Sequence, residues 1–166
     1  MASETYLALV TRSFEGALSG ACTTRVGGGA FRDCTGLTGA ELPYATSVGS
    51  YAFYGCTGLP EIDLPTCASL GSYAFYGCTA LARVDLAVCV SIGSNAFAGC
   101  TALDTLILRG GIVADLGGAL TDTPIASGEG YVYVPSELVE SYQAAYIWKN
   151  YPDQFRAIED YPDVCG

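Results

Sequence analysis

The sequence predicts a repeat solenoid, a coil that places short parallel β-strands on one face and turns on the other. A nine-residue segment, GSYAFYGCT, occurs unchanged at positions 49–57 and 71–79 and returns as GSNAFAGCT at 93–101. The copies follow one another with a period of 22 residues. One period cannot bury its apolar residues alone, so it must stack on its neighbours, and each repeat adds one layer.

The apolar residues of the layers form columns that run the length of the repeats. Five columns keep the same spacing: Phe31, Phe53, Phe75, Phe97; Cys34, Cys56, Cys78, Cys100; Leu37, Leu59, Leu81, Leu103; Leu42, Leu64, Leu86, Leu108; and Val26, Val48, Leu70, Ile92. Phenylalanine is the largest of these side chains, and four of them stacked in one column predict a spine along the core.

Within a layer, each element follows from the residues in order. The segment that ends in x-L-x-L alternates outward and inward residues, which predicts a short strand. Pro43 and Pro65 follow the strand and, because they have no N–H, end its pairing. Gly49, Gly71 and Gly93 then predict a turn with a positive φ. The Ala-Phe pair that comes next returns the chain to the core.

The two ends predict caps that cover the outer layers. We expect one domain over residues 1–166, with an N-terminal cap and degenerate repeat at 1–25, repeats of 22 residues at 26–109 and a C-terminal cap at 110–166. Ser3 is placed to begin a short helix through Val10. Residues 110–130 hold six glycines and predict an irregular turn, and 131–134 predict a last strand. A helix is then expected, with these residues on its apolar face: Leu138, Val139, Tyr142, Ala145 and Tyr146.

The cysteine spacing favours buried free thiols. Six of the eight cysteines fall in two columns, the one given above and a shorter one, Cys67 with Cys89, whereas Cys22 and Cys165 fit neither. A free thiol behaves as a small apolar side chain and suits a place beside the phenylalanines. Neighbouring layers bring these thiols within disulfide reach, so disulfides are an alternative. A linear column does not converge on a metal ion, and no metal or other cofactor is expected.

Charge and composition exclude several function classes. The chain has 17 acidic and 7 basic residues, a net charge of −10, and no histidine. Nucleic acids and anionic lipids require a basic surface, so neither is an expected partner. No segment approaches the ~18–20 apolar residues of a membrane span, and no signal-peptide pattern is visible, so membrane insertion is not expected. Without histidine, a cysteine nucleophile lacks its usual base.

The residues that face outward from the strands are the first candidates for binding. They are Gly39, Glu41, Pro43, Glu61, Asp63, Pro65, Arg83, Asp85, Ala87, Thr105, Ile107 and Arg109. The charged residues Glu41, Glu61, Asp63, Arg83 and Asp85 form the candidate partner surface, since solenoids bind on their concave face. A plainly solvated face is the alternative for each of them. No loop has the ligand spacing of a calcium site.

A second candidate surface is aromatic. Tyr51 and Tyr54, with Tyr73 and Tyr76 one layer on, flank the buried Ala-Phe pair. Tyrosine is enriched at binding interfaces, and its ring can also lie against a sugar. These four side chains are therefore candidates for contact with a protein or a carbohydrate, and packing between layers is the alternative.

The repeat resembles a known family. Its pattern A-F-x-x-C-T-x-L-x-x-[hydrophobic]-x-L-P is similar to the BspA-like, treponemal-type leucine-rich repeats of bacterial surface proteins and some phage-encoded proteins. The segment V-P-x-x-L-x-x-x-Y-x-x-A-x-x-W at 134–148 is similar to the C-terminal cap of many members. The resemblance implies a right-handed leucine-rich-repeat superhelix for protein–protein or cell-surface interaction, without enzymatic activity. It implies a secreted or cell-surface location, with a phage-encoded or cytoplasmic protein as the alternative.

Together these observations predict a non-enzymatic scaffold that binds a protein or a surface glycan through the exposed sheet face or the tyrosine-rich flank. The alternative is a carbohydrate-binding or carbohydrate-active module that uses the acidic face. Glu61, Asp63 and Asp85 would place carboxylates about 5–7 Å apart, near the separation used by glycosidases. The predicted sheet is shallow, and no cleft is evident that would raise the pKa of one carboxyl group, which disfavours catalysis.

Overall fold

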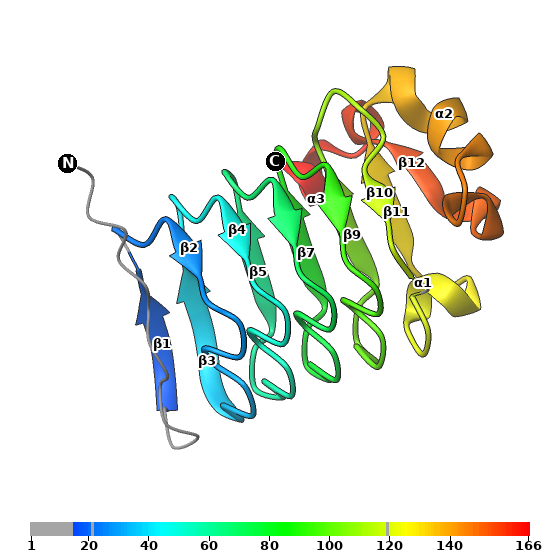
Figure 1. Cartoon of the computed structure of the whole chain (residues 1–166). Helices are drawn as coiled ribbons and strands as arrows, with labels where there is room; N and C mark the ends of the chain where they lie inside the picture. The colour runs from blue at the N-terminus through cyan, green and yellow to red at the C-terminus, as the bar shows by residue number, and fades with distance from the viewer. Residues whose placement is uncertain (1–14, 21, 119) are drawn as a thin grey trace.

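The chain winds as a stack of similar layers, and each layer adds a strand to two parallel sheets (Figure 1). The computed structural model describes residues 15–20, 22–118 and 120–166. The helix predicted from Ser3 to Val10 lies outside these residues. Glu61 pairs with Arg83, and Asp63 pairs with Asp85. Paired residues are thus one 22-residue period apart, which confirms the predicted solenoid.

We call the sheet with the longer strands the front sheet and the sheet with the two-residue strands the back sheet. The hydrogen-bonded strands of the front sheet lie in the order β12 (Phe155–Ala157), β11 (Tyr131–Val134), β9 (Thr105–Leu108), β7 (Arg83–Leu86) and β5 (Glu61–Leu64). Next to β5 lies β3 (Gly36–Glu41), which pairs instead with β1 (Glu15–Ser19) as a separate two-stranded sheet. The strands on this face therefore form two sheets, which are separated between β3 and β5.

The back sheet contributes two residues per layer. Its strands are β2 (Arg25–Val26), β4 (Ser47–Val48), β6 (Ser69–Leu70), β8 (Ser91–Ile92) and β10 (Asp115–Leu116). In each strand the second residue is buried and the first is not. Leu116 of β10 adds a fifth member to the apolar column that begins at Val26.

The core between the sheets contains the predicted phenylalanine spine. Phe31, Phe53, Phe75 and Phe97 are buried, and neighbouring rings stack at centroid distances of 5.1, 5.1 and 5.7 Å. The thiols of Cys56, Cys78 and Cys100 donate to phenylalanine carbonyls of the preceding layer, as Cys78 does to Phe53 at 3.0 Å. The phenylalanine column therefore connects neighbouring layers through both ring stacking and these hydrogen bonds.

The repeated glycines that follow the back strands β4, β6 and β8 have a different role from the predicted one. Gly49, Gly71 and Gly93 do not adopt a positive φ; that conformation occurs instead at Gly55, Gly77 and Gly99. A Cβ atom at Gly49 would lie 2.6 Å from a backbone nitrogen of the preceding layer, and Gly71 and Gly93 are equally crowded. Glycine is required at the three earlier positions because neighbouring layers approach too closely there for a side chain.

Proline accounts for the split in the front sheet. In later layers a backbone hydrogen bond joins the residues that come just before neighbouring front strands. Before β7 and β5, the Ala82 N–H donates to the Pro60 carbonyl at 2.8 Å. The residue one period earlier than Ala82 is Pro60 itself, which has no N–H to donate to Thr38. The hydrogen bond that would join β5 to β3 at this position is therefore missing.

Layering continues past residue 109, where the sequence predicted only an irregular turn. This stretch contains β10 and a short helix, α1 (Pro124–Ser127), before β11 pairs with β9. Tyr131 lies opposite Thr105, so this layer spans 26 residues rather than 22. The segment 110–134 thus forms one further layer of the coil, and the cap begins after it.

The C-terminal cap is helical, as predicted, but is broken into short pieces. It comprises η1 (Ser136–Leu138), α2 (Val139–Ala144), η2 (Trp148–Asn150), η3 (Pro152–Gln154), η4 (Ile158–Asp160) and α3 (Pro162–Cys165). Buried Tyr142 and Trp148 hydrogen-bond to the backbone N–H and carbonyl of Ala114. Tyr146 does not share their buried face, because α2 ends at Ala144, and its side chain is exposed. Among the described residues no helix is long and apolar enough to cross a membrane.

Candidate functional site

Four charged residues of the front sheet form a continuous chain of ion pairs. The Arg83 guanidinium contacts the Asp63 carboxylate at 2.6 Å and the Asp85 carboxylate at 2.9 Å. Arg109 binds the same Asp85 through Nε at 2.9 Å and Nη2 at 2.7 Å, and this hydrogen bonding raises the pKa of the guanidinium. We call Asp63, Arg83, Asp85 and Arg109 the ion ladder.

The predicted exposure of Asp85 is wrong. Its side chain is only 12% exposed because arginines from its own and the next strand flank it, and both of its oxygens accept hydrogen bonds from guanidinium groups. Asp85 is therefore a structural residue, although its outward place on β7 agrees with the sequence. Arg109, which the sequence placed outward but outside the candidate surface, is its main partner.

The C-terminal end of the chain covers the part of the sheet beyond the ion ladder. The Arg109 guanidinium also donates to the Cys165 carbonyl, and Cys165 is buried together with Ile107 and Tyr133. Tyr161 packs edge-on against Tyr133, with ring centroids 5.4 Å apart. The expectation that Ile107 is exposed is therefore wrong, because the C-terminal segment lies over β9 and β11 (Figure 1).

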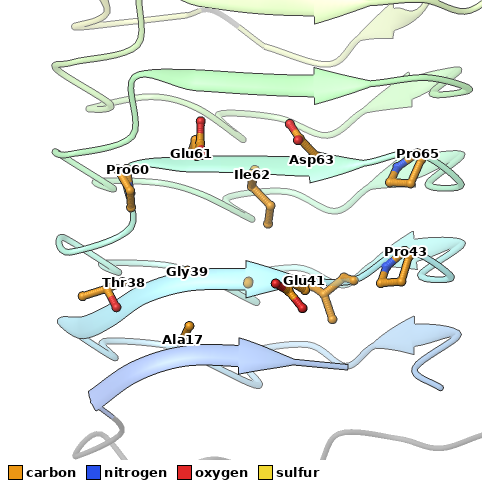
Figure 2. A pocket seen from close by; sticks show the side chains of 12 residues that line it. Ala17, Thr38, Gly39, Glu41, Pro43, Pro60, Glu61, Ile62, Asp63 and Pro65 are labelled. Carbon is orange, nitrogen blue, oxygen red and sulfur yellow. The ribbon is translucent and has the colours of Figure 1, made fainter. Parts of the chain in front are cut away.

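The opposite end of the sheet face stays open and is hollowed. A hollow of about 530 Å³ lies over the split between β3 and β5, and Figure 2 shows it from close by. Its lining is Ala17, Thr38, Gly39, Ala40, Glu41, Leu42, Pro43, Pro60, Glu61, Ile62, Asp63 and Pro65. We call this feature the β3–β5 hollow. Three of the five charged residues predicted for the partner surface line it.

The β3–β5 hollow is acidic and lacks its own cations. Glu41, at the end of β3, and Glu61, at the start of β5, are exposed and form no ion pair with any residue that the structure describes. Asp63 pairs with Arg83, yet its side chain remains 65% exposed. None of the described lining residues is a lysine or an arginine. The hollow therefore combines free negative charge with an apolar floor.

The four candidate tyrosines form a compact array on a different surface. Tyr51 stacks on Tyr73 at 5.0 Å and Tyr54 stacks on Tyr76 at 5.1 Å, while tilted contacts connect the two stacks. Arg32 lies over the rings of Tyr51 and Tyr54 at the N-terminal end. Much of the ring surface that could contact a sugar is thus used within the array.

Backbone strain marks two of these tyrosines. Tyr51 and Tyr73 have φ values of 61° and 59°, in the left-handed region that bulky side chains avoid. Glycine and asparagine, which tolerate this conformation, stand at the matching positions of the neighbouring layers, Gly29 and Asn95. The stacking between the tyrosines and their contact with Arg32 offset this strain.

Comparison with known proteins agrees with the repeat structure. The family model described as BspA type leucine rich repeat region matches residues 24–125 in six copies. The chain belongs to the BspA-type leucine-rich repeat family. The predicted family and the predicted fold are therefore confirmed, and membership supports a role in interaction, for which such repeats serve as generally non-enzymatic scaffolds.

A solved structure of similar architecture is that of a leucine-rich cell surface protein from Faecalibacterium prausnitzii A2-165. Its structure matches this BspA-type chain with a TM-score of 0.51 and 25% sequence identity, over 64% of this chain and 27% of that protein. The match thus spans about a quarter of the larger protein's length. No curated protein matches the chain.

Proposed function

We propose that this protein is a non-enzymatic interaction scaffold that binds a protein partner through the β3–β5 hollow. The hollow is the observation that carries the proposal, because it is a concave, charged and uncovered part of the front sheet. Further along the same sheet, arginines neutralise the carboxylates and the C-terminal segment covers the apolar positions. The family and its cell-surface neighbour support a secreted or surface location.

The same geometry argues against carbohydrate chemistry on this face. A glycosidase requires one carboxyl group free to give up a proton and a second free to act as nucleophile or base. Asp63 and Asp85 are instead ion-paired to Arg83 and Arg109. The remaining carboxylates, Glu41 and Glu61, lie at an open surface, where water is not excluded. Glycan binding is kept as an outcome of the test below.

The test fills the hollow without changing its charge. Gly39 lines the hollow, and a Cβ atom there meets only Ala17 at ordinary contact distance, so we expect the fold to accept Gly39→Phe. The intact protein and this variant are applied to arrays of purified extracellular proteins and of glycans. We expect binding to a subset of proteins that Gly39→Phe abolishes.

The matched control is Thr57→Phe, at an exposed threonine outside the hollow. It adds the same side chain and should bind like the unchanged protein. Equal binding by Gly39→Phe and the unchanged protein would contradict the proposal. Binding only to glycans would favour the carbohydrate alternative.

A further inference from the structure

We infer that the occupant of the β3–β5 hollow is an arginine or lysine side chain on an extended segment of a partner protein, an inference that rests on the proposed function. The argument starts from the ion ladder, which alternates acidic and basic groups along the front sheet from Arg109 to Asp63. Asp63 is the last residue of this alternating series, although the column of acidic residues continues to Glu41 in the preceding layer.

The register of the repeats shows what the next layer lacks. Glu41, Asp63 and Asp85 occupy one outward column at intervals of 22 residues. Arg83 bridges the two aspartates from the neighbouring outward column. The residues that precede Arg83 in its own column are Glu61 and Gly39, so no guanidinium stands between Glu41 and Asp63. Among the described residues, Glu41 and Glu61 thus have no cationic partner, whereas Arg83 and Arg109 supply one in the later layers.

The surroundings of these carboxylates suit a long basic side chain better than a bare ion. Three prolines, Pro43, Pro60 and Pro65, line the hollow with Ile62 (Figure 2), and Ala40 is also part of the lining. The aliphatic stem of arginine or lysine packs on such apolar surface while its charged head reaches a carboxylate at the edge. Arginine fits best because its planar guanidinium binds two carboxylates at once, as Arg83 does within this chain.

The volume and openness of the site favour an extended segment over a folded domain edge. About 530 Å³ accommodates one or two side chains, and the C-terminal segment already covers the front sheet farther along, at β9 and β11. That segment shows how a short piece of chain lies on this face. It places apolar side chains on Ile107 and Tyr133 and is fastened by a charged hydrogen bond from Arg109.

The test uses a defined peptide and the intact, nitrogen-15-labelled protein. The peptide acetyl-Val-Arg-Val-Arg-Val-amide is titrated while backbone amide shifts are followed by NMR. We expect saturable shifts concentrated in β3 and β5. The same peptide with citrulline in place of arginine keeps the shape but removes the charge, and it should not saturate. Equal binding of the citrulline peptide would overturn the inference.

The protein side of the test is Glu41→Gln with Glu61→Gln. Affinity for the arginine peptide should fall about fivefold, since exposed ion pairs contribute modestly. The matched control, Glu129→Gln with Glu137→Gln, makes the same change in net charge at exposed sites outside the hollow and should bind normally. Unchanged affinity in the first pair would contradict the inference.

The array experiment distinguishes failure of the inference from failure of the proposed function. If array partners are lost by Gly39→Phe but fully retained by the Glu41→Gln, Glu61→Gln pair, the hollow is a binding site and the basic occupant is wrong. If Gly39→Phe retains every partner, the hollow is not the binding site and the proposed function fails. If Gly39→Phe and the Glu41→Gln, Glu61→Gln pair both lose the array partners, the result supports the proposed function and the basic occupant together.

Discussion

Core residues of the repeats make the same contacts with the neighbouring layer in successive repeats. Phe53 stacks on Phe75, and the Cys78 thiol donates to the carbonyl of Phe53. A residue type that suits one layer therefore suits them all, which explains why the columns are uniform. Outward residues have no such constraint, and their columns mix Gly39, Glu61 and Arg83.

At the residue scale, removal of one ring from the spine should weaken the whole stack. We expect Phe75→Ala to cost about 3–5 kcal/mol of unfolding free energy, because Phe75 is fully buried between Phe53 and Phe97. Urea denaturation measures this. Tyr44→Ala, at an exposed side chain, is the control and should change stability by less than about 0.5 kcal/mol. A loss below about 1 kcal/mol for Phe75→Ala would contradict a packed spine.

Also at the residue scale, buried thiols should make the protein sensitive to alkali. Burial is the main reason that the pKa of Cys67 rises from its ordinary 9.0 to about 11. Above pH 9 the unfolded chain loses this proton while the folded chain keeps it, so unfolding is favoured as pH rises. The stabilising contribution is complete below pH 9 and is lost between about 9 and 11, by about 1 kcal/mol per pH unit.

Urea midpoints at pH 8 and pH 10 measure this effect. The unchanged protein should lose more stability over this interval than Cys67→Ala, which has no thiol to titrate. Cys22→Ala is the matched control, since Cys22 is exposed, and it should behave like the unchanged protein. An identical loss in Cys67→Ala and the unchanged protein would show that another group causes the alkaline sensitivity.

At the scale of single elements, the front sheet is organised by what covers each strand. β9 and β11 lie beneath the C-terminal segment, β7 carries the centre of the ion ladder, and β3 and β5 remain open. Helix α3 is only four residues long and depends on contacts with the sheet. Arg109 connects it to Asp85 and hence to the ladder.

Loss of Arg109 should therefore release α3 from the sheet. In a Cys22→Ser background, Arg109→Gln should increase the alkylation rate of Cys165, which is buried in the unchanged protein, by at least about tenfold. Mass spectrometry of the modified peptide measures the rate. Arg25→Gln, on the back sheet, is the control and should leave the rate unchanged. An unaffected Cys165 in Arg109→Gln would show that the apolar contacts alone hold the segment.

At the scale of the whole molecule, the layers are interchangeable units. The identical segments at 49–57 and 71–79 lie one period apart, so deletion of residues 58–79 removes one layer without disturbing the order of the columns. Stability in such proteins is a sum over layers and their interfaces. The shortened chain should therefore fold, with unchanged circular dichroism per residue and a lower melting temperature.

The same deletion should close the β3–β5 hollow. Ala82 would follow Thr38 in the stack and offer the N–H that Pro60 lacks. Arg83 would lie one period from Gly39 and as many positions from Glu41 as it now lies from Asp63. The ion ladder would then extend to Glu41, and the arginine peptide should no longer bind. Deletion of residues 58–68, half a period, is the control and should prevent folding because it breaks every column. A disordered 58–79 deletion would contradict the independence of the layers.

Much of this protein was predictable from the sequence alone, because its core interactions repeat. The period, the phenylalanine and cysteine columns, the strand positions and the family all follow from residues that contact their own equivalents 22 positions away. The prediction assigned the positive φ to the wrong glycines, because close approach of layers and positive φ both require glycine and the sequence does not separate the two causes. The sequence shows Pro60, but only the structure shows that the hydrogen bond between β5 and β3 would require an N–H at this position.

The accessible part of the front sheet depended on contacts that do not repeat. Asp85 and Ile107 are outward residues that become buried only because Arg109 and the segment ending at Cys165 lie against them. Those contacts join residues as many as 56 positions apart and follow no period. The repeat period therefore specifies the layers of this solenoid, while non-periodic contacts made on folding determine which outward residues become buried and which, such as Glu41 and Glu61, stay exposed.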